Sequence, residues 1–397
     1  METLGERYVR IKEERAQNPP PQEPSYNMFS DIKAMLAGSE LVYAFATLRI
    51  KAMEKDLEKE HLIGISPGNK EERQKILSEG IKDKITIENI VEFIEANLKT
   101  LEDDKAINPD NILIDVLLDM SMIKNAYIAK FDAKNSGHAF VYGIYVNHDR
   151  KRISLSFRGT SATRDWLANA SVLKSELDPS ASLVKLGFDE NKKIYVHGGF
   201  KAYLMGDRKK AENIDTGKYK DIKDELVELY TSGECDGYEL IVTGHSLGGA
   251  LSTLMAFNLA SSSKIRKILG NKPVVNISFA SPYVGGKVFS EAFKILEKAG
   301  RIQHIRVSNE TDVVPVGIIA PNYMHVGINL HLDPVKDVIL VYQGKRSFNS
   351  QFSPFQNAAN HSLDEYDTRF RKAKDQIESM TINDIYSNSS ITKDFAE

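Results

Sequence analysis

Residues 238–260 read YELIVTGHSLGGALSTLMAFNLA, and this stretch decides the fold. It opens with a short apolar run, 240–242, of the kind that makes a buried strand. The chain then turns at Ser246, which has glycines on both sides. Beyond the turn, apolar residues recur at helical spacing. They are Ala250, Leu251, Leu254, Met255 and Leu259. A serine between glycines, where a strand turns into a helix, is the pattern of a nucleophile elbow.

The chemistry of an elbow explains its residue types. The serine takes a strained backbone conformation, and small residues beside it let the strand and the helix approach closely. The next backbone amide, that of Leu247, lies at the helix N-terminus, where developing negative charge is stabilised. An ordinary glycine-rich turn is the alternative, because G-x-S-x-G alone is common. The strand before it and the helix after it favour the elbow.

Length and composition limit the classes of protein to consider. The 397 residues allow one large domain with an appendage, or two domains. Hydrophobic residues make up 42% and charged residues 27%, as in ordinary soluble proteins. A net charge of −3 gives no indication of a nucleic-acid partner. We expect an intracellular protein without a transmembrane segment, because the sequence has one cysteine, Cys235, and shows neither a secretory signal nor a bilayer-spanning apolar run.

Four parts are expected along the chain. Residues 1–24 end in the proline-rich NPPPQEP and are expected to form a flexible arm. Residues 25–110 are expected to be an N-terminal helical region, because apolar side chains recur there on helical faces. Residues 111–379 are expected to form the catalytic domain, which opens with a helix near 111–130. Residues 380–397 are polar and are expected to form a loose tail.

Strand and helix patterns alternate between residues 139 and 375. This alternation predicts an α/β fold with a layered sheet. A charged connection is expected over residues 171–195. The predicted strands lie within 139–147, 153–157, 240–242, 273–286 (a strand running into a loop), 304–309 and a last pair within 324–343. The predicted helices are 221–231, 287–298 and a short one after 361.

A serine nucleophile needs a base, and the base needs a carboxylate that orients it. In α/β-hydrolases the acid and then the histidine follow the serine along the chain. Asp312 is favoured as the acid, because it follows the strand HIRVSN and a catalytic acid lies at the carboxyl end of a strand. Glu310 and Asp333 are competitors, and a structural turn residue is the other reading of Asp312.

Three histidines follow Asp312 and compete for the role of base. His325 and His331 lie in or beside the last strand pair, where a histidine is often structural. His361 lies on a loop just before a helix, which leaves it free to reach the serine, and is therefore favoured. His245 is adjacent to the serine, and we expect it to act as a strut.

The segment FRGTS, residues 157–161, follows a strand and could complete an oxyanion hole. Gly159 permits a tight turn, and Thr160 offers a backbone amide and a hydroxyl, so Thr160 is the expected second donor. A plain turn at the strand end is the alternative. The next residues include Trp166 and Leu167 among polar neighbours. Their spacing fits equally a lid that opens at a lipid surface and a helix packed on the core.

Taken in order, these motifs resemble those of the class 3 lipase family, from about residue 139 to residue 371. Ala280 replaces a glycine that is usual in the family. The matching segments are Phe157-Arg158-Gly159-Thr160 with Asp165-Trp166-Leu167, then 196–200 (VHGGF), 244–250 (GHSLGGA), 279–285 (FASPYVG), 309–315 (NETDVVP), 325–327 (HVG) and 361–366 (HSLDEY).

The resemblance implies an α/β-hydrolase fold, with a mostly parallel central sheet flanked by helices and an added N-terminal helical region. It implies a catalytic triad of Ser246, Asp312 and His361, with Thr160 and Leu247 as oxyanion donors. The implied activity is hydrolysis of carboxylic esters of lipids, in the first place acylglycerols. The enzyme would contact a lipid surface transiently and use no metal or organic cofactor.

Two alternatives to an acylglycerol lipase remain open. The first is a phospholipase A1 or a galactolipase; a charged head group would need a cationic residue near the lid, and Arg164 is a candidate. The second is a lipid-binding protein that keeps the hydrolase fold without turnover. The chain also lacks the secretory signal and disulfides of secreted fungal members of the family, and the resemblance does not extend to residues 1–110.

Overall fold

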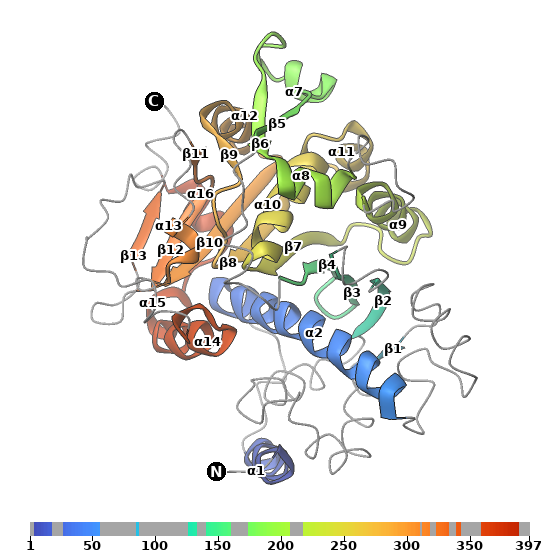
Figure 1. The fold of residues 1–397 in the computed structure, drawn as a ribbon, viewed down its shortest axis with the longest axis vertical. Coiled ribbons are helices and arrows are strands. Elements are labelled where there is room, and N and C mark those ends of the chain that lie inside the picture. Colours follow the sequence, from blue (N-terminus) through green and yellow to red (C-terminus); the bar gives the residue numbers. More distant parts are fainter. Residues whose placement is uncertain are drawn as a thin grey trace.

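A nine-stranded sheet forms the centre of the protein (Figure 1). The computed structural model describes residues 4–17, 27–55, 85–86, 126–132, 140–159, 174–206, 217–309, 312–317, 323–332, 339–342 and 359–388. In spatial order the strands are β1 (Ile85–Thr86), β2 (Ala126–Asp132), β3 (Tyr142–Asn147), β4 (Arg152–Phe157), β7 (Glu239–His245), β8 (Val274–Phe279), β10 (Ile302–Asn309), β12 (Ile328–Leu332) and β13 (Ile339–Tyr342).

The five central strands, β4, β7, β8, β10 and β12, run parallel. Antiparallel strands flank them, β1, β2 and β3 on one side and β13 on the other. Parallel strands need crossover connections, which the helices between them supply. The predicted α/β class and the last strand pair are thereby confirmed.

Helices cover both faces of this sheet. Strand β7 shows why, because Leu240 and Val242 belong to the apolar cluster on one face and Ile241 to the cluster on the other. The first face is covered by α8 (Gly198–Met205), α9 (Tyr219–Thr231), α10 (Leu247–Ala260), α11 (Ser263–Leu269) and α12 (Lys287–Lys298). The second face is covered by α2 (Met28–Lys55), α14 (Leu363–Lys372), α15 (Lys374–Ile377) and α16 (Ile382–Ser387) (Figure 1).

A second, four-stranded sheet takes two of its strands from the region expected to be a charged connection. Its order is β11 (Tyr323–Met324), β9 (Gly285–Gly286), β6 (Ile194–His197) and β5 (Lys174–Leu177). Strand β6 alternates, with Ile194 and Val196 buried and Tyr195 exposed, and β5 pairs with it antiparallel. The short helix α7 (Ala181–Val184) lies between these two strands. The described charged residues of this region therefore lie on the hairpin of β5 and β6 and not in a loop.

The helix predicted near 111–130 is wrong at its C-terminal end. Residues 126–132 form strand β2, which pairs with β3, and the rest of the predicted helix lies outside the described residues. The register shifts between Ile128 and Lys130. This bulge puts the buried residues Tyr127, Ile128 and Phe131 at a spacing that also fits one helical face. The sequence pattern was therefore ambiguous.

The N-terminal part differs from the expected arm and separate helical region. Residues 4–17 form the helix α1 (Leu4–Gln17). Helix α2 packs on the second face of the sheet, against β4 and β7, and buries Leu41 and Phe45 completely. It therefore forms part of the cover of the central sheet. A second helix predicted from residue 87 lies outside the described residues. None of the helices described has the length and apolar character needed to cross a membrane.

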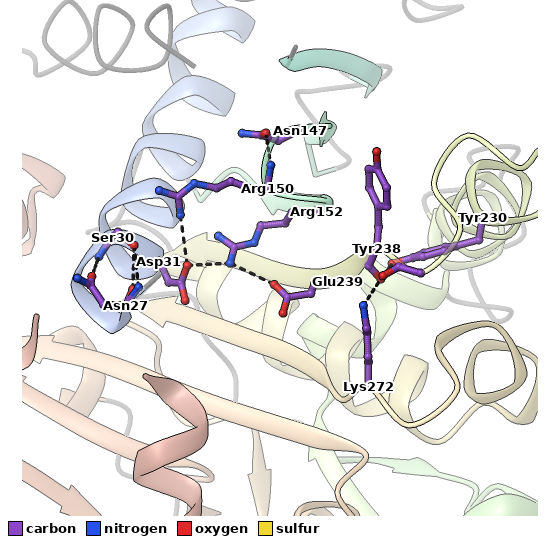
Figure 2. A network of polar contacts seen from close by, with 11 residues as sticks. Asn27, Ser30, Asp31, Asn147, Arg150, Arg152, Tyr230, Tyr238, Glu239 and Lys272 are labelled. Carbon is purple, nitrogen blue, oxygen red and sulfur yellow. Dashed lines mark hydrogen bonds and ion pairs between the residues drawn. The ribbon is translucent and has the colours of Figure 1, made fainter. Parts of the chain in front are cut away.

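Helix α2 is anchored by a polar network at its first turn (Figure 2). The Ser30 amide donates to the Asn27 side chain at 2.8 Å, which caps the helix N-terminus. Asp31 accepts from Arg152 of β4 at 2.7 Å, and Arg152 also contacts Glu239 of β7 at 3.2 Å. Because the Arg152 guanidinium is buried, this network ties α2 to two central strands.

The C-terminal segment is ordered further than expected. Helix α16 begins with a capping box, in which Thr381 and Asp384 satisfy each other's backbone amides. Ile382 and Ile385 are buried in the apolar cluster of the second face. The expectation of a loose tail from residue 380 is therefore wrong for residues 382–387. Residues 389–397 lie outside the described part.

Candidate active site

Ser246 lies at the turn between β7 and α10, with the backbone conformation of a nucleophile elbow. Its φ of 59° and ψ of −124° are rare for a residue with a side chain and store strain. Its amide donates to the carbonyl of Phe279 on β8 at 3.0 Å, and its carbonyl accepts from the Gly249 amide at 2.9 Å. The surrounding strand and helix therefore hold this strained turn in place.

The glycines of the elbow are required by close backbone approach. A Cβ atom on Gly248 would overlap the carbonyl oxygen of Phe157 at the end of β4, and one on Gly244 would overlap the backbone of Gly248. A Cβ atom on Gly249 would lie 3.0 Å from the carbonyl oxygen of Phe279. The N-terminus of α10 thus packs directly against the ends of β4 and β8, the two strands beside β7. This packing fixes the position of the serine.

Asp312 and His361 form a buried acid–base pair. Asp312 follows β10, and His361 ends the short 3₁₀ helix η2 (Ala359–His361) that precedes α14. The Nδ1 atom of His361 lies 2.9 Å from Oδ2 and 3.0 Å from Oδ1 of Asp312. Tyr366 donates its hydroxyl to the same carboxylate at 2.7 Å, and the Val314 amide donates at 2.9 Å. Asp312 therefore has a donor from the histidine, from a tyrosine and from the backbone.

The other ring nitrogen of His361 and the hydroxyl of Ser246 are both buried. Neither Nε2 of His361 nor Oγ of Ser246 has a hydrogen-bond partner among the residues that the structure describes. They are thus not hydrogen-bonded to each other in this structure. Catalytic hydrogen bonds are often long before substrate binds. A basic nitrogen and a hydroxyl, each buried and without a partner, are the two groups that proton transfer from a serine requires.

His245 places the loop of His361 against the elbow. Its Nε2 donates to the backbone carbonyl of His361 at 2.7 Å, and the two rings lie 4.6 Å apart between centroids. Tyr43 of α2 contacts the other ring nitrogen, Nδ1, at 3.3 Å. Burial, and secondarily the proximity of His361, lowers the pKa of His245 well below its usual value, so its ring stays neutral. His245 therefore makes structural contacts, as predicted for it from the sequence.

The oxyanion donors are described only in part. Leu247 is the first residue of α10, so its amide is among those that have no acceptor within the helix. Gly159 lies beside the serine, since a Cβ atom built on it would be 3.2 Å from the Cβ atom of Ser246. The end of β4, extended to Gly159, is therefore next to Ser246. Six residues singled out from the sequence lie outside the described residues: Thr160, Arg164, Trp166, Leu167, Glu310 and Asp333.

The two competing histidines have other partners. His325 contacts the carbonyl of Pro315 through Nε2 at 2.7 Å and stacks on Tyr283, with 3.8 Å between ring centroids. His331 contacts the hydroxyl of Ser308 through Nδ1 at 3.1 Å. Both histidines are therefore held in local structural contacts, whereas His361 is the histidine that meets Asp312.

Sequence reasoning missed the role of two tyrosines. Tyr366 lies in the quoted segment that follows His361, one and a half helical turns along, and its position in α14 brings its hydroxyl to Asp312. Tyr43 carried no signal beyond its place on a helix. Within the described ranges, no group of three or more His, Cys, Asp or Glu side chains is arranged to hold a metal ion.

Comparison with known proteins agrees with the resemblance seen in the sequence. Residues 154–319 match the family model described as lipase (class 3). Phospholipase A1-II 6 of Oryza sativa subsp. japonica is 30% identical over 190 residues, which cover 46% of this chain and 44% of the relative. Phospholipase A(1) DAD1, chloroplastic, of Arabidopsis thaliana is 28% identical over 166 residues, covering 42% and 33%.

Among solved structures, lipase II from Rhizopus niveus matches with a TM-score of 0.47 and 18% identity, over 71% of this chain and 96% of that one. The chain spans less than half the length of the two curated relatives named above. The family match includes the elbow and Asp312, and ends before His361. Residues 154–319 thus match the class 3 lipase family, and the mostly parallel central sheet with helices on both faces has the arrangement of an α/β-hydrolase fold.

Proposed function

We propose that this protein hydrolyses carboxylic esters of lipids through an acyl-enzyme. Ser246 Oγ attacks the ester carbonyl carbon while Nε2 of His361 takes the hydroxyl proton. Asp312 keeps the imidazole oriented by accepting from Nδ1 and stabilises the imidazolium that forms. The products of this step are a tetrahedral intermediate and a protonated His361.

The oxyanion of that intermediate needs donors that are already in place. We assign the Leu247 amide at the α10 N-terminus and, next to Gly159, the Thr160 amide. Loss of one such donor typically costs about 3 kcal/mol of transition-state stabilisation. His361 then returns its proton to the leaving alcohol as the C–O bond breaks. Water, deprotonated by the same nitrogen, attacks the acyl-serine, releases the carboxylic acid and restores the free hydroxyl.

One observation carries the proposal. The buried His361–Asp312 pair lies against the elbow, with the His361 carbonyl bonded to the residue that precedes Ser246. Asp312 holds Nδ1 of His361, whereas Nε2 has no hydrogen-bond partner among the described residues. The pair is therefore arranged as an oriented base rather than as a buried strut.

The test is hydrolysis of p-nitrophenyl esters of graded chain length by wild type and Ser246→Ala. We expect wild type to turn over and the variant to lose at least about a thousandfold in kcat. A fluorophosphonate probe, which labels an activated serine, should mark wild type and not the variant. If wild type is inert on every ester and resists the probe, the protein is a lipid-binding relative without turnover.

The head group is a separate question, and a phospholipase A1 is the second candidate. The two curated relatives reported above are both named phospholipases A1, which favours this candidate over the acylglycerol lipase. Two substrates distinguish a phospholipase A1 from an acylglycerol lipase: phosphatidylcholine with a different acyl chain at each position, and triacylglycerol. Release of the sn-1 acid alone would support phospholipase A1. Release of acid from triacylglycerol only would support the acylglycerol lipase. A galactolipid panel tests the galactolipase reading in the same way.

A further inference from the structure

A tyrosine from outside the matched family segment reaches the candidate active site. Tyr43 belongs to α2, whereas the family match begins at residue 154. Its hydroxyl lies 3.3 Å from Nδ1 of His245 and against the backbone of Gly159, where an added Cβ atom would overlap it. The ring of Tyr43 also meets that of His245 edge-on, with 6.2 Å between centroids. Helix α2 therefore contributes a polar group beside the elbow as well as apolar cover.

The donors and acceptors in this contact fall into one consistent order. The His361 carbonyl can only accept, so Nε2 of His245 carries the ring proton and donates to it at 2.7 Å. Nδ1 of the neutral ring is then an acceptor, and the Tyr43 hydroxyl donates to it. One chain of hydrogen bonds thus runs from Tyr43 through His245 to the loop of the base, and Tyr43 itself packs against Gly159.

Electrostatics keep both central groups in the required protonation states. Burial, and next the nearby Glu40 carboxyl group, raises the pKa of Tyr43, so the hydroxyl remains a donor. Burial, followed by the proximity of His361, lowers the pKa of His245, so its Nδ1 remains an acceptor. Neither group changes charge near neutral pH, so these hydrogen bonds persist there. We call this chain of hydrogen bonds the brace.

We propose that Tyr43 is a positioning residue that couples the oxyanion segment at Gly159 to the catalytic base through His245. The inference rests on the proposed hydrolase function for its kinetic consequence. Ser246 lies between the two ends of this brace, because His245 precedes it and Gly159 packs on it. Movement of either end changes the distance between the serine and its base or its oxyanion donors, and a shift of about 1 Å in such a site can cost about a hundredfold in rate.

The test compares Tyr43→Phe with Ser39→Ala. Ser39 lies one helical turn earlier on α2, is fully buried and contacts Thr243 of β7 at 3.3 Å, so its loss also removes a buried hydroxyl contact between α2 and the sheet. We expect Tyr43→Phe to lower kcat by about tenfold to a hundredfold, with KM changed less than about twofold. Ser39→Ala should keep kcat within about twofold of wild type. Equal kcat values for the two variants would overturn the inference.

If Tyr43→Phe does not fold, two His245 variants test the same chain of hydrogen bonds. Gln at position 245 retains a donor for the His361 carbonyl, whereas Ala does not. We expect His245→Gln to recover most of the kcat that His245→Ala loses. If Tyr43→Phe does fold, we also expect it to lower kcat less in the His245→Ala background than in wild type, because the effects of coupled residues are not additive. Strict additivity, or equal losses in the two His245 variants, would contradict the coupling.

A readout without turnover separates this inference from the proposed function. The proton between Nδ1 of His361 and Asp312 gives a low-field NMR resonance that reports the orientation of the base. Tyr43→Phe should shift or broaden this resonance, whereas Ser39→Ala should leave it as in wild type. If wild type hydrolyses no ester, the proposed function fails and the resonance still decides the role of Tyr43. An unchanged resonance in Tyr43→Phe would overturn that role.

Discussion

Nδ1 of His361 lies 2.9 Å and 3.0 Å from the two carboxylate oxygens of Asp312, although 49 positions separate the residues in sequence. The carboxylate is buried and also accepts from Tyr366 and from the Val314 amide. A carboxylate held by so many donors has a fixed position. It therefore determines which way the histidine ring faces and which of its nitrogens is left to act as the base.

Asp312→Asn should disable the base while leaving the fold in place. The amide removes the charge that stabilises the imidazolium, and its NH₂ group favours the wrong tautomer of His361. We expect kcat on p-nitrophenyl butyrate to fall by about 10³–10⁴-fold. Circular dichroism and the thermal unfolding midpoint serve as the control for folding. A variant that retains more than about a tenth of wild-type kcat would show that Asp312 does not have the assigned role.

Trp166 provides a test of contact with a lipid surface. It lies outside the described residues, and its place after the oxyanion segment predicts a lid. Trp166→Ala should reduce hydrolysis of an emulsified ester by about tenfold or more and change hydrolysis of a dissolved short-chain ester by less than about twofold, because only the first needs the apolar face of a lid. Equal losses on both substrates would contradict a lid and support a helix packed on the core.

Asp31 provides a test of whether α2 belongs to the catalytic domain (Figure 2). Asp31→Asn leaves the buried Arg152 guanidinium with Glu239, whose side chain is half exposed. Breaking a buried ion pair is strongly destabilising, and with this remaining partner we expect a loss of about 2 kcal/mol in the free energy of unfolding by urea.

Asp224→Asn is the matched control for Asp31→Asn, because Asp224 pairs with Lys220 on the surface of α9. An exposed pair contributes little, so this variant should unfold as wild type does. If α2 were a separate unit, Asp31→Asn would leave the main unfolding transition unchanged, and the two variants would behave alike.

Much of the catalytic core was predictable because its patterns are local. The elbow shows a strand, a glycine turn and a helix within 23 consecutive residues, and helix 287–298 was predicted with the bounds that the structure has. Chain order and the ends of strands favoured Asp312 and His361 over their competitors, and the family resemblance assigned them to the triad. Chain order and strand ends are consequences of topology that one sequence carries.

The rest depended on tertiary structure that local patterns do not encode. Strand β2 was predicted as part of a helix because its bulge places Tyr127, Ile128 and Phe131 at a spacing that both structures allow. Tyr43 is one of several aromatic and apolar residues on α2, and nothing in the local sequence distinguishes it from a core residue. Only the docking of α2 on the ends of β4 and β7 brings its hydroxyl to His245.

Glu297 on α12 makes the stability of the protein depend on pH. Its carboxyl group is buried, and burial raises the pKa to about 8, against a smaller lowering by the hydroxyl of Tyr386, which donates to it at 2.9 Å, and by Lys294. Between the unfolded value of 4.5 and the folded value of about 8, the folded state holds the extra proton. The contribution of this proton to stability therefore falls as pH rises through this window, and it is fully lost above it.

Glu297→Gln should remove this dependence. Glutamine keeps an acceptor for Tyr386 and never ionises, so the variant should gain several degrees in unfolding midpoint over wild type at about pH 9 and little at about pH 5. Glu40, whose pKa burial also raises to about 8, keeps part of the slope. Glu291→Gln, at a partly exposed position of α12 where the carboxylate pairs with Lys192, is the control and should follow the wild-type pH profile. A difference between Glu297→Gln and wild type that is the same at both pH values would mean that Glu297 ionises in the folded protein as it does in the unfolded chain.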